Sequence, residues 1–482
     1  MKILLTGATG YIARRLLPVL LDKGCEVVCC VRDAARFSSE KYRSGLLSVI
    51  EADFLDPSTL SNIPFDIDAA YYLIHSMSAS RGDFEKLEET SAANFRDRIR
   101  ATKARQVIYL SGIVNDDSLS KHLSSRKNVE TILGTGSCSL TTLRAGIIIG
   151  PGSASFEIIR DLVEKLPVMV APKWLNTRSQ PIAIKNVIEF LSGVLLNEST
   201  FNASYDIGGP DIMTYRQMLL GFAKVRGLRR RIVTVPVMTP KLSSYWLYFI
   251  TSTSYSLAQN LVDSMKVEVI CRENDLAALL SIKPMKYEDA IREAFEKIEM
   301  NQVDSSWKDA FASGILDAEI SKFAEVPVHG CYSDRREMQV KDIDTTLDRI
   351  WSLGGTKGWY YGNWLWGLRG FVDKLWGGVG LRRGRKNQNE LSPGDALDFW
   401  RVLIASREER RLLLFAEMKL PGEAWLEFII DDRGILHQTA TFRPLGLWGR
   451  LYWFSVLPFH AFIFRGLIRN LAGSNRRHNN SC

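Results

Sequence analysis

The chain has 482 residues, of which 46% are hydrophobic and 24% charged, and its formal net charge is +8. This length exceeds one ordinary hydrophobic core, so we expect two or three domains, and the composition excludes a disordered, collagen-like or disulfide-stapled protein. The basic residues are scattered and no nucleic-acid-binding motif occurs, so we expect a small-molecule partner and no nucleic acid.

The seven cysteines have neither CxxC spacing nor the spacing of Cys/His metal ligands. We therefore expect free thiols, no metal site and a cytoplasmic setting. Met1 leads directly into an apolar strand, which predicts no secretory leader. Since no run of about eighteen apolar residues occurs, we predict no membrane-spanning helix.

The first 150 residues alternate short apolar runs with amphipathic helical stretches. This alternation predicts an α/β fold, a doubly wound Rossmann sheet of parallel strands buried on both faces. The expected strands are Ile3–Leu5, Glu26–Val31, Leu46–Ile50, Ala69–Ile74, Gln106–Leu110 and Leu140–Leu143, and the expected helices are Tyr11–Lys23, Asp83–Thr102 and Leu119–Leu133.

Residues 151–300 keep an α/β pattern without strict alternation, and we assign them to the substrate side of the same domain, 1–300. We expect Thr214 to cap a helix that runs to Val225, and a long aromatic-rich helix over Leu242–Met265. Residues 301–330 are polar with little pattern, so we place the domain linker there.

Residues 331–475 are expected to form a second, α+β domain in which antiparallel strands pack on a closing helix. The expected strands are Phe399–Ser406, Arg411–Lys419, Ala424–Asp431 and Ile435–Arg443. We favour burial of the aromatic tail, Leu445–Leu471, against this sheet; the alternative is a helix lying on anionic lipid. The aromatic and glycine density of Trp359–Trp376 is likewise interpreted as packing and turns.

The sequence TGATGYIA, residues 6–13, follows the first strand and opens the first helix. Gly7 permits a tight turn, and Gly10 lets the backbone approach a pyrophosphate whose charge lies at the helix N-terminus. Ala13 stands where a third glycine is usual, and its methyl group is small enough for helix–strand packing. The expected cofactor contacts in this loop are Gly7, Ala8, Thr9, Gly10, Tyr11 and Ile12.

The second strand ends in Arg32, and this residue bears on the choice of cofactor. A guanidinium there can bind a 2′-phosphate through paired hydrogen bonds, which favours NADP(H). Asp33 follows directly and could bind a ribose hydroxyl instead, so NAD(H) is the alternative. Asp53 is placed to meet the adenine amino group or to cap the following turn, and Arg36 is interpreted as a solvated helix residue. Further cofactor contacts are expected from Phe54, Ile74, His75 and Ser111.

With this loop, Arg32 and Ser111, the first 300 residues resemble the short-chain dehydrogenase/reductase superfamily, in its atypical, NmrA-like and extended-like branch. The stretches YYLIHSM (71–77) and GSASFE (152–157) look like a bacterial subgroup that carries a C-terminal domain of unknown function. The stretches GWYY (358–361) and FWRV (399–402) look like that second domain, which is thought similar to the helix-grip (START-like, SRPBCC) fold. The resemblance implies NAD(P)H binding, oxidoreductase chemistry and an apolar pocket in the second domain.

The superfamily uses Ser, Tyr and Lys, with the tyrosine and lysine one turn apart on a helix. Ser111 matches the serine, and if Glu130 is the glutamate that often follows the lysine, Arg126 and His122 replace the lysine and tyrosine. Histidine can move a proton near neutral pH, and arginine can fix a ribose or carbonyl oxygen. The resemblance thus implies a modified proton-transfer site, with an ordinary polar helix start as the alternative.

Two further residues end strands of the predicted sheet. His75 either lines the nicotinamide side of the crevice or forms a hydrogen bond with backbone in a turn, and Arg144 either reaches substrate or pairs with a carboxylate.

Three functions stay open. The first is an NADP(H)-dependent oxidoreductase or isomerase that acts on an apolar carbonyl or quinone. The second is a non-catalytic NADP(H) sensor or scaffold, and the third is a lipid or quinone carrier peripheral to the inner membrane face.

Overall fold

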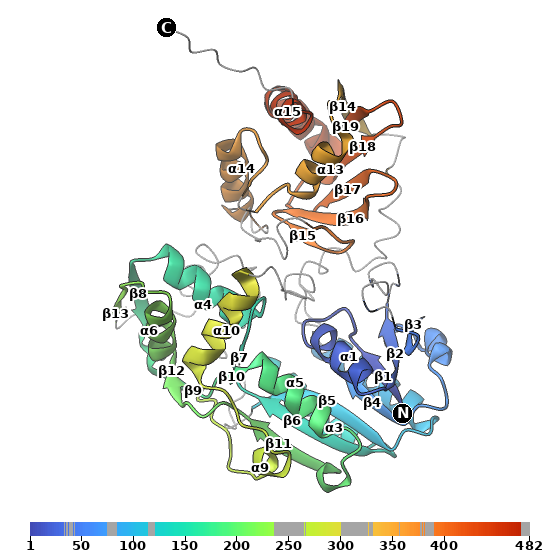
Figure 1. Ribbon diagram of the computed structural model, residues 1–482, viewed down its shortest axis with the longest axis vertical. Helices are drawn as coiled ribbons and strands as arrows, with labels where there is room; N and C mark the ends of the chain where they lie inside the picture. The colour runs from blue at the N-terminus through green and yellow to red at the C-terminus, as the bar shows by residue number, and fades with distance from the viewer. Residues whose placement is uncertain are drawn as a thin grey trace. The chain divides into compact units, whose positions relative to one another are not determined.

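The computed structural model describes residues 1–32, 44–74, 84–113, 121–235, 267–299, 331–355, 357–375 and 390–473, with a few single residues between these ranges. The chain forms two compact units, Met1–Gly314 and Ile315–Cys482 (Figure 1). The expected linker, 301–330, and the expected helix over Leu242–Met265 lie almost entirely outside the described residues.

A seven-stranded parallel sheet forms the centre of the first unit, in the order β3-β2-β1-β4-β5-β6-β11 (Figure 1). This is the Rossmann order, in which the change of direction between β1 and β4 opens a crevice at the carboxyl ends of the strands. The doubly wound parallel sheet predicted from the alternating pattern is therefore confirmed. The strands are β1 (Lys2–Thr6), β2 (Glu26–Val31), β3 (Leu47–Glu51), β4 (Ala69–Tyr72), β5 (Gln106–Gly112), β6 (Ser139–Ala145) and β11 (Ala203–Ile207).

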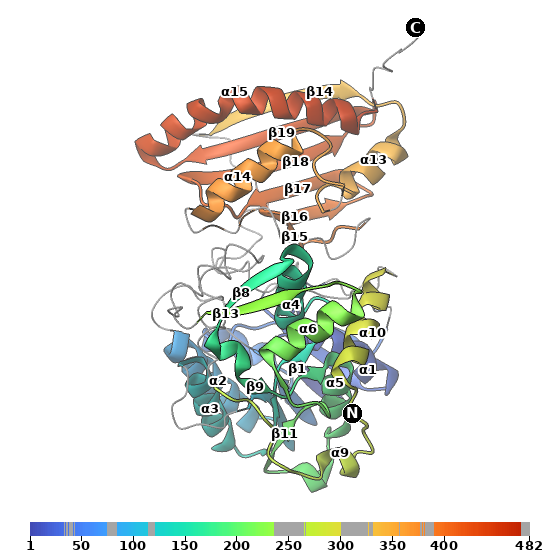
Figure 2. The same ribbon diagram turned by 90° about the vertical axis from the view of Figure 1, so that its left-hand side faces the viewer.

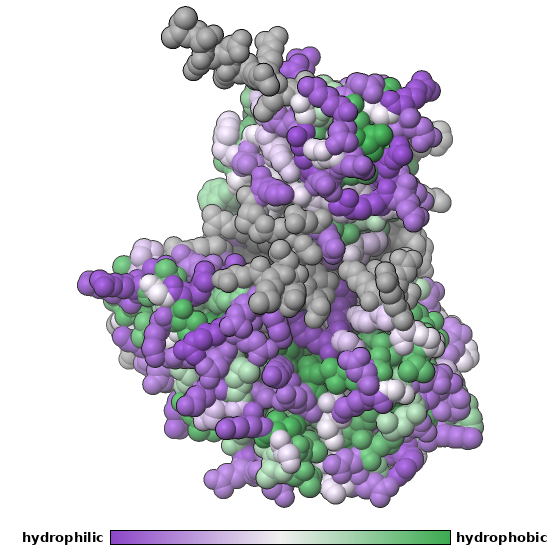
Figure 3. Space-filling view, viewed as in Figure 1, coloured by the Kyte–Doolittle hydropathy of each residue, from purple (hydrophilic) through white to green (hydrophobic). Residues whose placement is uncertain are grey.

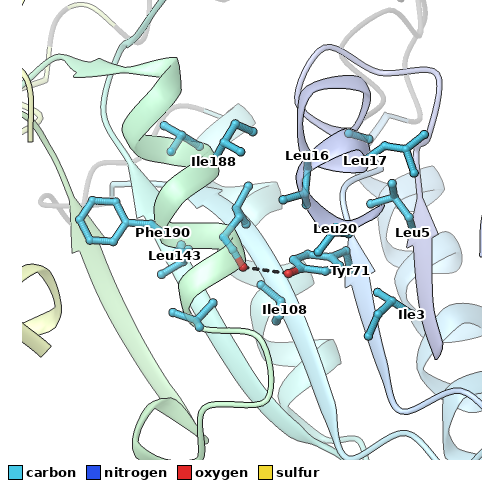
Figure 4. Close-up of a cluster of buried hydrophobic side chains, with 14 of the residues drawn as sticks. Ile3, Leu5, Leu16, Leu17, Leu20, Tyr71, Ile108, Leu143, Ile188 and Phe190 are labelled. Atoms are coloured by element: carbon cyan, nitrogen blue, oxygen red, sulfur yellow. Dashed lines mark hydrogen bonds between the residues drawn. The ribbon is translucent and has the colours of Figure 1, made fainter. Parts of the chain in front are cut away.

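Helices cover both faces of this sheet because successive strand residues point to opposite faces. Leu5 packs into the core under α1 and α5, whereas Leu4 packs into the core under α2 and α3. On the first of these faces the Tyr71 hydroxyl donates a hydrogen bond of 2.8 Å to the Leu191 carbonyl oxygen of α5 (Figure 4). The four helices are α1 (Ala13–Asp22), α2 (Phe84–Arg100), α3 (Lys121–Gly134) and α5 (Ile184–Gly193).

The rest of the first unit forms a separate core beyond β6. Phe156, Phe222 and Phe295 pack together there with ring centroids 5.5 to 5.6 Å apart. Thr214 caps α6 as predicted, and Gln217 completes a capping box with it. Hydrophobic and hydrophilic residues are interspersed over the face of this unit seen in Figure 3. Its helices are α4 (Ala154–Lys165), α6 (Tyr215–Val225), α9 (Leu276–Leu279) and α10 (Tyr287–Glu299), and its longer strands are β8 (Val168–Pro172) and β13 (Arg231–Val235).

Six antiparallel strands form the sheet of the second unit, in the order β14-β19-β18-β17-β16-β15 (Figure 2). The four predicted strands are confirmed, with ends shifted by a few residues. The edge strand β14 was not predicted, because its sequence YSDRREMQ is polar and alternates half-buried with exposed residues. The strands are β14 (Tyr332–Gln339), β15 (Ala396–Leu397), β16 (Trp400–Ser406), β17 (Arg411–Ala416), β18 (Gly422–Ile430) and β19 (Ile435–Pro444).

The closing helix α15 (Gly446–Leu471) lies along this sheet, packed on β14 and β19 (Figure 2). In its second half Phe464 and Leu467 are 3% and 0% exposed, whereas in its first half Trp448 and Phe454 are 78% and 60% exposed. Trp453 is also buried, at 5% exposure, and stacks on Tyr332 and Phe442 of the sheet, whereas Phe459 and Phe462 are 56% and 54% exposed. The preferred interpretation of the tail as a helix buried on its sheet is thus right for Trp453 and for the last turns from Ile463, and wrong for the exposed aromatic residues before them. Two further helices, α13 (Ile343–Trp351) and α14 (Asn363–Leu375), complete the unit.

Within the described residues, α15 is also the one helix that is long and apolar enough to cross a membrane. The candidate segment is Trp448–Leu471, in which an 18-residue window has a mean hydropathy of 1.4 and is 22% buried. This measure rests on length and composition alone. Because the second half of the helix belongs to the core of the second unit, we treat α15 as part of that fold.

The six cysteines among the described residues are free, as expected. Cys29 and Cys30 lie in β2, and burial raises the pKa of each thiol to about 12. These two thiols therefore stay protonated and unreactive at neutral pH.

Candidate functional site

The loop after β1 is held so closely against the end of β4 that Gly7 has no room for a side chain. Its φ is +63°, and a Cβ there would lie 2.7 Å from the Leu73 carbonyl oxygen. The Gly10 amide donates to the Gly7 carbonyl oxygen at 2.7 Å, and a Cβ on Gly10 would lie 2.9 Å from that oxygen. The backbone is thereby bare at both positions, as close approach to a pyrophosphate requires.

Thr6, the last residue of β1, holds the loop to β4. Its side chain is fully buried, and its hydroxyl donates to the Tyr71 carbonyl oxygen at 2.9 Å and accepts from the Leu73 amide at 3.1 Å. These bonds fix the strand ends where the crevice opens. The sequence analysis did not single out Thr6, because a threonine in a β-strand is ordinary and carries no local signal.

Helix α1 begins directly after this loop, and no side chain among the described residues caps it. The Arg14 and Arg15 amides donate to the Gly10 and Ile12 carbonyl oxygens at 3.1 Å, and the partial positive charge of the helix N-terminus faces an anion without a side-chain cap. Ala8 is fully buried, whereas Thr9 and Ile12 are half-buried. A bare backbone beside an uncapped helix N-terminus fits the diphosphate of a dinucleotide.

Tyr11 can serve this site only through its backbone, because its side chain is engaged elsewhere. The Arg15 guanidinium lies 3.9 Å from the centre of the Tyr11 ring, and the hydroxyl lies beside Ser153 and Glu157. Burial raises the pKa of Tyr11 to about 12. Arg15 also donates to the Pro151 carbonyl oxygen at 2.8 Å, so these side chains join the start of α1 to the segment that leads into α4.

Arg32 follows β2 directly, and its side chain is exposed. The carboxyl ends of parallel strands share one edge of a sheet, so Arg32 lies on the same edge as the glycine loop. This is where a 2′-phosphate would be held. Asp33 and Arg36 lie outside the described residues.

Asp53 follows β3 on the same edge and is half-buried. One of its carboxylate oxygens accepts from the Leu55 amide at 3.0 Å. Asp53 thus caps the turn that directly follows it, in which the Asp56 amide donates to the Asp53 carbonyl oxygen at 2.9 Å. The 3-10 helix after that turn, Pro57–Asn62, is capped by Asp56, whose carboxylate accepts from the Ser58 amide at 3.0 Å. The adenine contact of Asp53 stays a prediction.

Phe54 and Ile74 also lie after strand ends, but both pack into the core under α2 and α3. Phe54 is 4% exposed, and its ring centre lies 5.5 Å from that of Phe95. Ile74 is half-buried. Their cofactor contacts stay predictions, and His75 lies outside the described residues.

Ser111 lies at the carboxyl end of β5, is 2% exposed and forms a hydrogen bond with the Tyr109 hydroxyl. Arg126 reaches the same strand end from α3, with Nη1 donating to the Leu110 carbonyl oxygen at 3.5 Å. Its Nε is buried and has no hydrogen-bond partner among the described residues. His122 stands one turn earlier on α3, but its side chain lies outside the described part. The structure thus brings Ser111 and Arg126 together.

Arg144 forms an ion pair with Glu130 of α3, with Nη2 and Nε at 2.6 and 3.1 Å from the two carboxylate oxygens. The alternative that Arg144 pairs with a carboxylate is confirmed. Asp206 of β11 lies 3.8 Å from Nη1 of Arg144 and binds Arg272 at 2.8 Å. This chain of charges holds α3, β6 and β11 together behind the crevice.

A buried polar pair between α2 and α3 escaped the sequence analysis. Glu88 and Ser125 are 5% and 4% exposed, and the serine hydroxyl donates to the glutamate carboxylate. Burial, with a smaller contribution from Glu88, raises the pKa of the nearby Tyr109 to about 12. Glu88 lies among the solvated acids of an amphipathic helix, so no pattern marks it as buried.

Two known families match the chain. Residues 7–136 match the family described as NAD(P)H-binding, and residues 329–467 match a family described as a protein of unknown function, DUF2867. No curated protein matches the chain. With the strand order and the glycine loop, these matches show that the first unit is an NAD(P)H-binding Rossmann domain.

Solved structures share the fold of this unit. A nucleoside-diphosphate-sugar epimerase from Staphylococcus aureus matches with a TM-score of 0.50 and 14% identity, over 61% of this chain and 100% of its own. The NADPH-dependent quinone oxidoreductase from Escherichia coli matches with 0.51 and 16%, over 61% and 99%. The triphenylmethane reductase of Citrobacter sp. matches with 0.51 and 17%, over 61% and 100%. At these identities the likeness shows the fold alone.

Proposed function

We propose that the chain is an NADP(H)-dependent oxidoreductase of the atypical short-chain dehydrogenase/reductase type, acting on an apolar carbonyl or quinone-like substrate. The observation that carries this proposal is the loop at Gly7, where a Cβ would lie 2.7 Å from the Leu73 carbonyl oxygen, beside an uncapped helix N-terminus. The exposed guanidinium of Arg32 favours NADP(H), and NAD(H) is the alternative.

The described residues suggest a division of labour at the end of β5. When bound, the nicotinamide ring supplies or accepts the hydride. Ser111 donates a hydrogen bond to the substrate oxygen, and the buried Nε of Arg126 holds a ribose or carbonyl oxygen. Because arginine does not release its proton near neutral pH, proton transfer falls to His122, which shares a helix face with Arg126.

Nucleotide titrations of the full-length protein test the cofactor part of the proposal. We expect NADPH to bind at least tenfold more tightly than NADH, and Arg32→Ala to weaken NADPH binding about tenfold, or 1.4 kcal/mol, without changing NADH binding. The matched control is Arg229→Ala, which removes another exposed arginine of the same unit. Absence of binding by either nucleotide would overturn the proposal, and equal affinities would overturn the preference for NADP(H).

Oxidation of NADPH in the presence of a panel of naphthoquinones tests the reaction. We expect Ser111→Ala and His122→Ala each to lower kcat about a hundredfold or more, because they remove groups that act on the substrate, and His122→Ala to leave the Kd for NADPH unchanged. Lys127→Ala, an exposed position on the same helix, serves as the control. Tight NADPH binding without turnover of any acceptor would contradict the oxidoreductase part of the proposal and support only a nucleotide-binding function.

For the second unit we propose the helix-grip (START-like) fold, on the ground that one long helix lies along an antiparallel sheet. Sequence resemblance and this layout support the same assignment. An experimental structure of the second unit in which α15 leaves the sheet would contradict it.

Peripheral contact with an anionic membrane is a second candidate function, which the exposed part of α15 favours. Trp448, Phe454 and Phe459 are 78%, 60% and 56% exposed, and Arg450 and Arg465 are exposed on the same helix. Exposed aromatic rings with arginines beside them suit a helix that lies in the headgroup region of anionic lipid.

Sedimentation with vesicles tests this candidate. We expect the protein to bind vesicles of phosphatidylglycerol and phosphatidylcholine, but not phosphatidylcholine alone, and to release them at high salt. The double variant Trp448→Ser/Phe454→Ser should bind at least tenfold more weakly. Phe65→Ser, at a 58% exposed aromatic position of the first unit, should bind as the wild type does. Binding that is equal for both lipids, or absent, would exclude the candidate.

A further inference from the structure

Tyr109 is a buried tyrosine of β5 that the reaction proposed above does not use. It stands two residues before Ser111 in the strand, so both side chains point to the face of the sheet that α2 and α3 cover. Tyr109 is 4% exposed, and its ring centre lies 5.9 Å from that of Tyr72 in the same core. A phenyl ring such as that of Phe95 fills this core without a hydroxyl, so the hydroxyl of Tyr109 needs a separate explanation.

The Tyr109 hydroxyl connects Ser111 to helix α3. It donates to the Arg126 carbonyl oxygen at 3.4 Å and forms a second hydrogen bond with the Ser111 side chain. A phenol carries a single hydrogen, and here that hydrogen is directed at Arg126, so in the second bond Ser111 donates to the phenol oxygen. The hydroxyl hydrogen of Ser111 thus points at Tyr109 in this structure.

Rotation of two hydroxyl groups reverses this chain of hydrogen bonds. The contact between Tyr109 and the Arg126 carbonyl is longer than the usual range for O–H···O bonds, about 2.5 to 3.0 Å, so little is lost when it breaks. If Tyr109 then donates to Ser111, the hydrogen of Ser111 is released for a substrate oxygen. Neighbouring hydrogen bonds polarise one another, so a serine hydroxyl that accepts from Tyr109 is also a stronger donor.

The Tyr109 hydroxyl is suited to donation and not to proton transfer. Burial raises the pKa of Tyr109 to about 12, and the charge of Arg126 lowers it by a smaller amount. The hydroxyl therefore keeps its hydrogen at neutral pH and acts through hydrogen bonds alone. This separates its role from the proton transfer proposed for His122.

We propose that Tyr109 is a positioning residue whose hydroxyl donates to Ser111 while Ser111 donates to the substrate oxygen. The inference rests on the role proposed above for Ser111, and it adds a residue that acts through Ser111 without contact to the substrate. It requires that loss of the Tyr109 hydroxyl slows the reaction only while Ser111 is present.

Reduction of a naphthoquinone by NADPH, measured with the full-length protein, tests this dependence. Tyr109→Phe keeps the ring and removes the hydroxyl, and it should lower kcat about tenfold. In the Ser111→Ala background the same substitution should change kcat by less than about twofold, because the group that Tyr109 positions is gone. The matched control is Tyr72→Phe. It removes another buried hydroxyl of this core, which donates to the Ser91 hydroxyl at 3.2 Å, and should leave kcat within about twofold of the wild type.

A second variant, Tyr109→3-fluorotyrosine, separates the hydroxyl from the packing of the ring. It keeps the hydroxyl and nearly the same shape, and fluorine makes the phenol a stronger donor, so kcat should be at least that of the wild type. A kcat as low as that of Tyr109→Phe would show that ring packing sets the rate, and would overturn the inference.

The remaining outcomes distinguish this inference from the proposed function. An unchanged kcat in Tyr109→Phe, or an equal loss with and without Ser111, would overturn the role of Tyr109 and leave the proposed reaction intact. Absence of quinone turnover by the wild type would overturn the proposed reaction, and the role of Tyr109 with it.

Discussion

The two units build their candidate sites from opposite parts of the polypeptide. In the first unit the backbone forms the site, with the bare peptide groups at Gly7 and Gly10 beside the N-terminus of α1. In the second unit side chains form it, as aromatic rings around an interior cavity. Peptide dipoles suit an anionic cofactor and aromatic walls suit an apolar molecule. The difference shows how one chain can carry two kinds of site in two units. We expect each unit to unfold, and to respond to its own ligand, independently of the other.

The largest effect that tests this separation should come from the buried ion pair of the second unit. Nε of Arg401 lies 3.0 Å from Oε1 of Glu417, and the two side chains are 2% and 1% exposed. Glu417→Leu should lower the free energy of unfolding of the second unit by about 3–5 kcal/mol, because it leaves a buried charge without its partner. Urea unfolding with and without NADPH measures this, since NADPH should protect only the first unit.

The matched control for Glu417→Leu is an exposed pair in the same unit. Arg407 and Asp348 lie 2.9 Å apart with side chains 49% and 68% exposed. Asp348→Ala should therefore change stability by less than about 1 kcal/mol. If Glu417→Leu shifted the NADPH-sensitive transition as strongly as the other one, the units would not be separable.

Acid should weaken the second unit selectively through His460. Burial lowers the pKa of His460 to about 4 in the folded chain, while Asp334 raises it and Arg336 lowers it by smaller amounts. Between about pH 6.5 and 4 the unfolded chain binds a proton that the folded chain does not, so stability falls as the pH falls. The loss attributable to His460 should reach about 3 kcal/mol by pH 4. It is measured as the difference between wild type and His460→Gln across this window, and parallel pH profiles would contradict it.

A single methyl group at Gly7 should abolish nucleotide binding by the first unit. In Gly7→Ala the new Cβ meets the Leu73 carbonyl oxygen, and the φ of +63° becomes strained. We expect the Kd for NADPH to rise about a hundredfold, or about 2.7 kcal/mol, with no change in the urea unfolding transition of the second unit. Gly45→Ala, where a Cβ would have nothing within 4 Å, is the control. Unchanged NADPH binding by Gly7→Ala would refute a backbone-built site.

The smallest effect is expected at the cap of α6. The Thr214 hydroxyl accepts from the Gln217 amide at 3.1 Å. Thr214→Ala should destabilise the first unit by about 1 kcal/mol, because one helix amide loses its partner. The NADPH-sensitive transition should move and the other should not. Thr131→Ala, inside α3, should have a smaller effect, and a shift in both transitions would speak against independent units.

The Rossmann unit could be predicted from sequence because its signals are local. Alternating apolar runs fix the strands, and the spacing of Gly7 and Gly10 marks the loop. Finer assignments are harder where two residues offer the same chemistry. Asp53 and Asp56 are both carboxylates after β3, and only the path of the chain decides that Asp53 accepts from the Leu55 amide while Asp56 caps the 3-10 helix Pro57–Asn62. Thr6 and Glu88 gain their roles from partners that are distant in sequence.

The family resemblance implied an apolar pocket in the second unit, but the residues that line it could not be predicted, because they are scattered along the chain. Trp366, Trp400 and His460 come from α14, β16 and α15, so no spacing connects them. The aromatic-rich segments were interpreted as packing, which is right for Trp359 at 1% exposure but wrong for Trp364 at 69%. In α15 apolar residues surround the whole helix, so hydrophobic periodicity could not separate its buried residues from its exposed ones.

The contact between Gly7 and the Leu73 carbonyl has a consequence for redesign of cofactor preference. The loop is shaped by main-chain contact and by the buried hydroxyl of Thr6, so its conformation does not depend on the residue at the end of β2. Arg32 is exposed and adds nothing to that scaffold. On the proposed role of Arg32, a substitution at position 32 should therefore change which nucleotide the protein prefers, while the loop proposed to bind the diphosphate keeps its conformation.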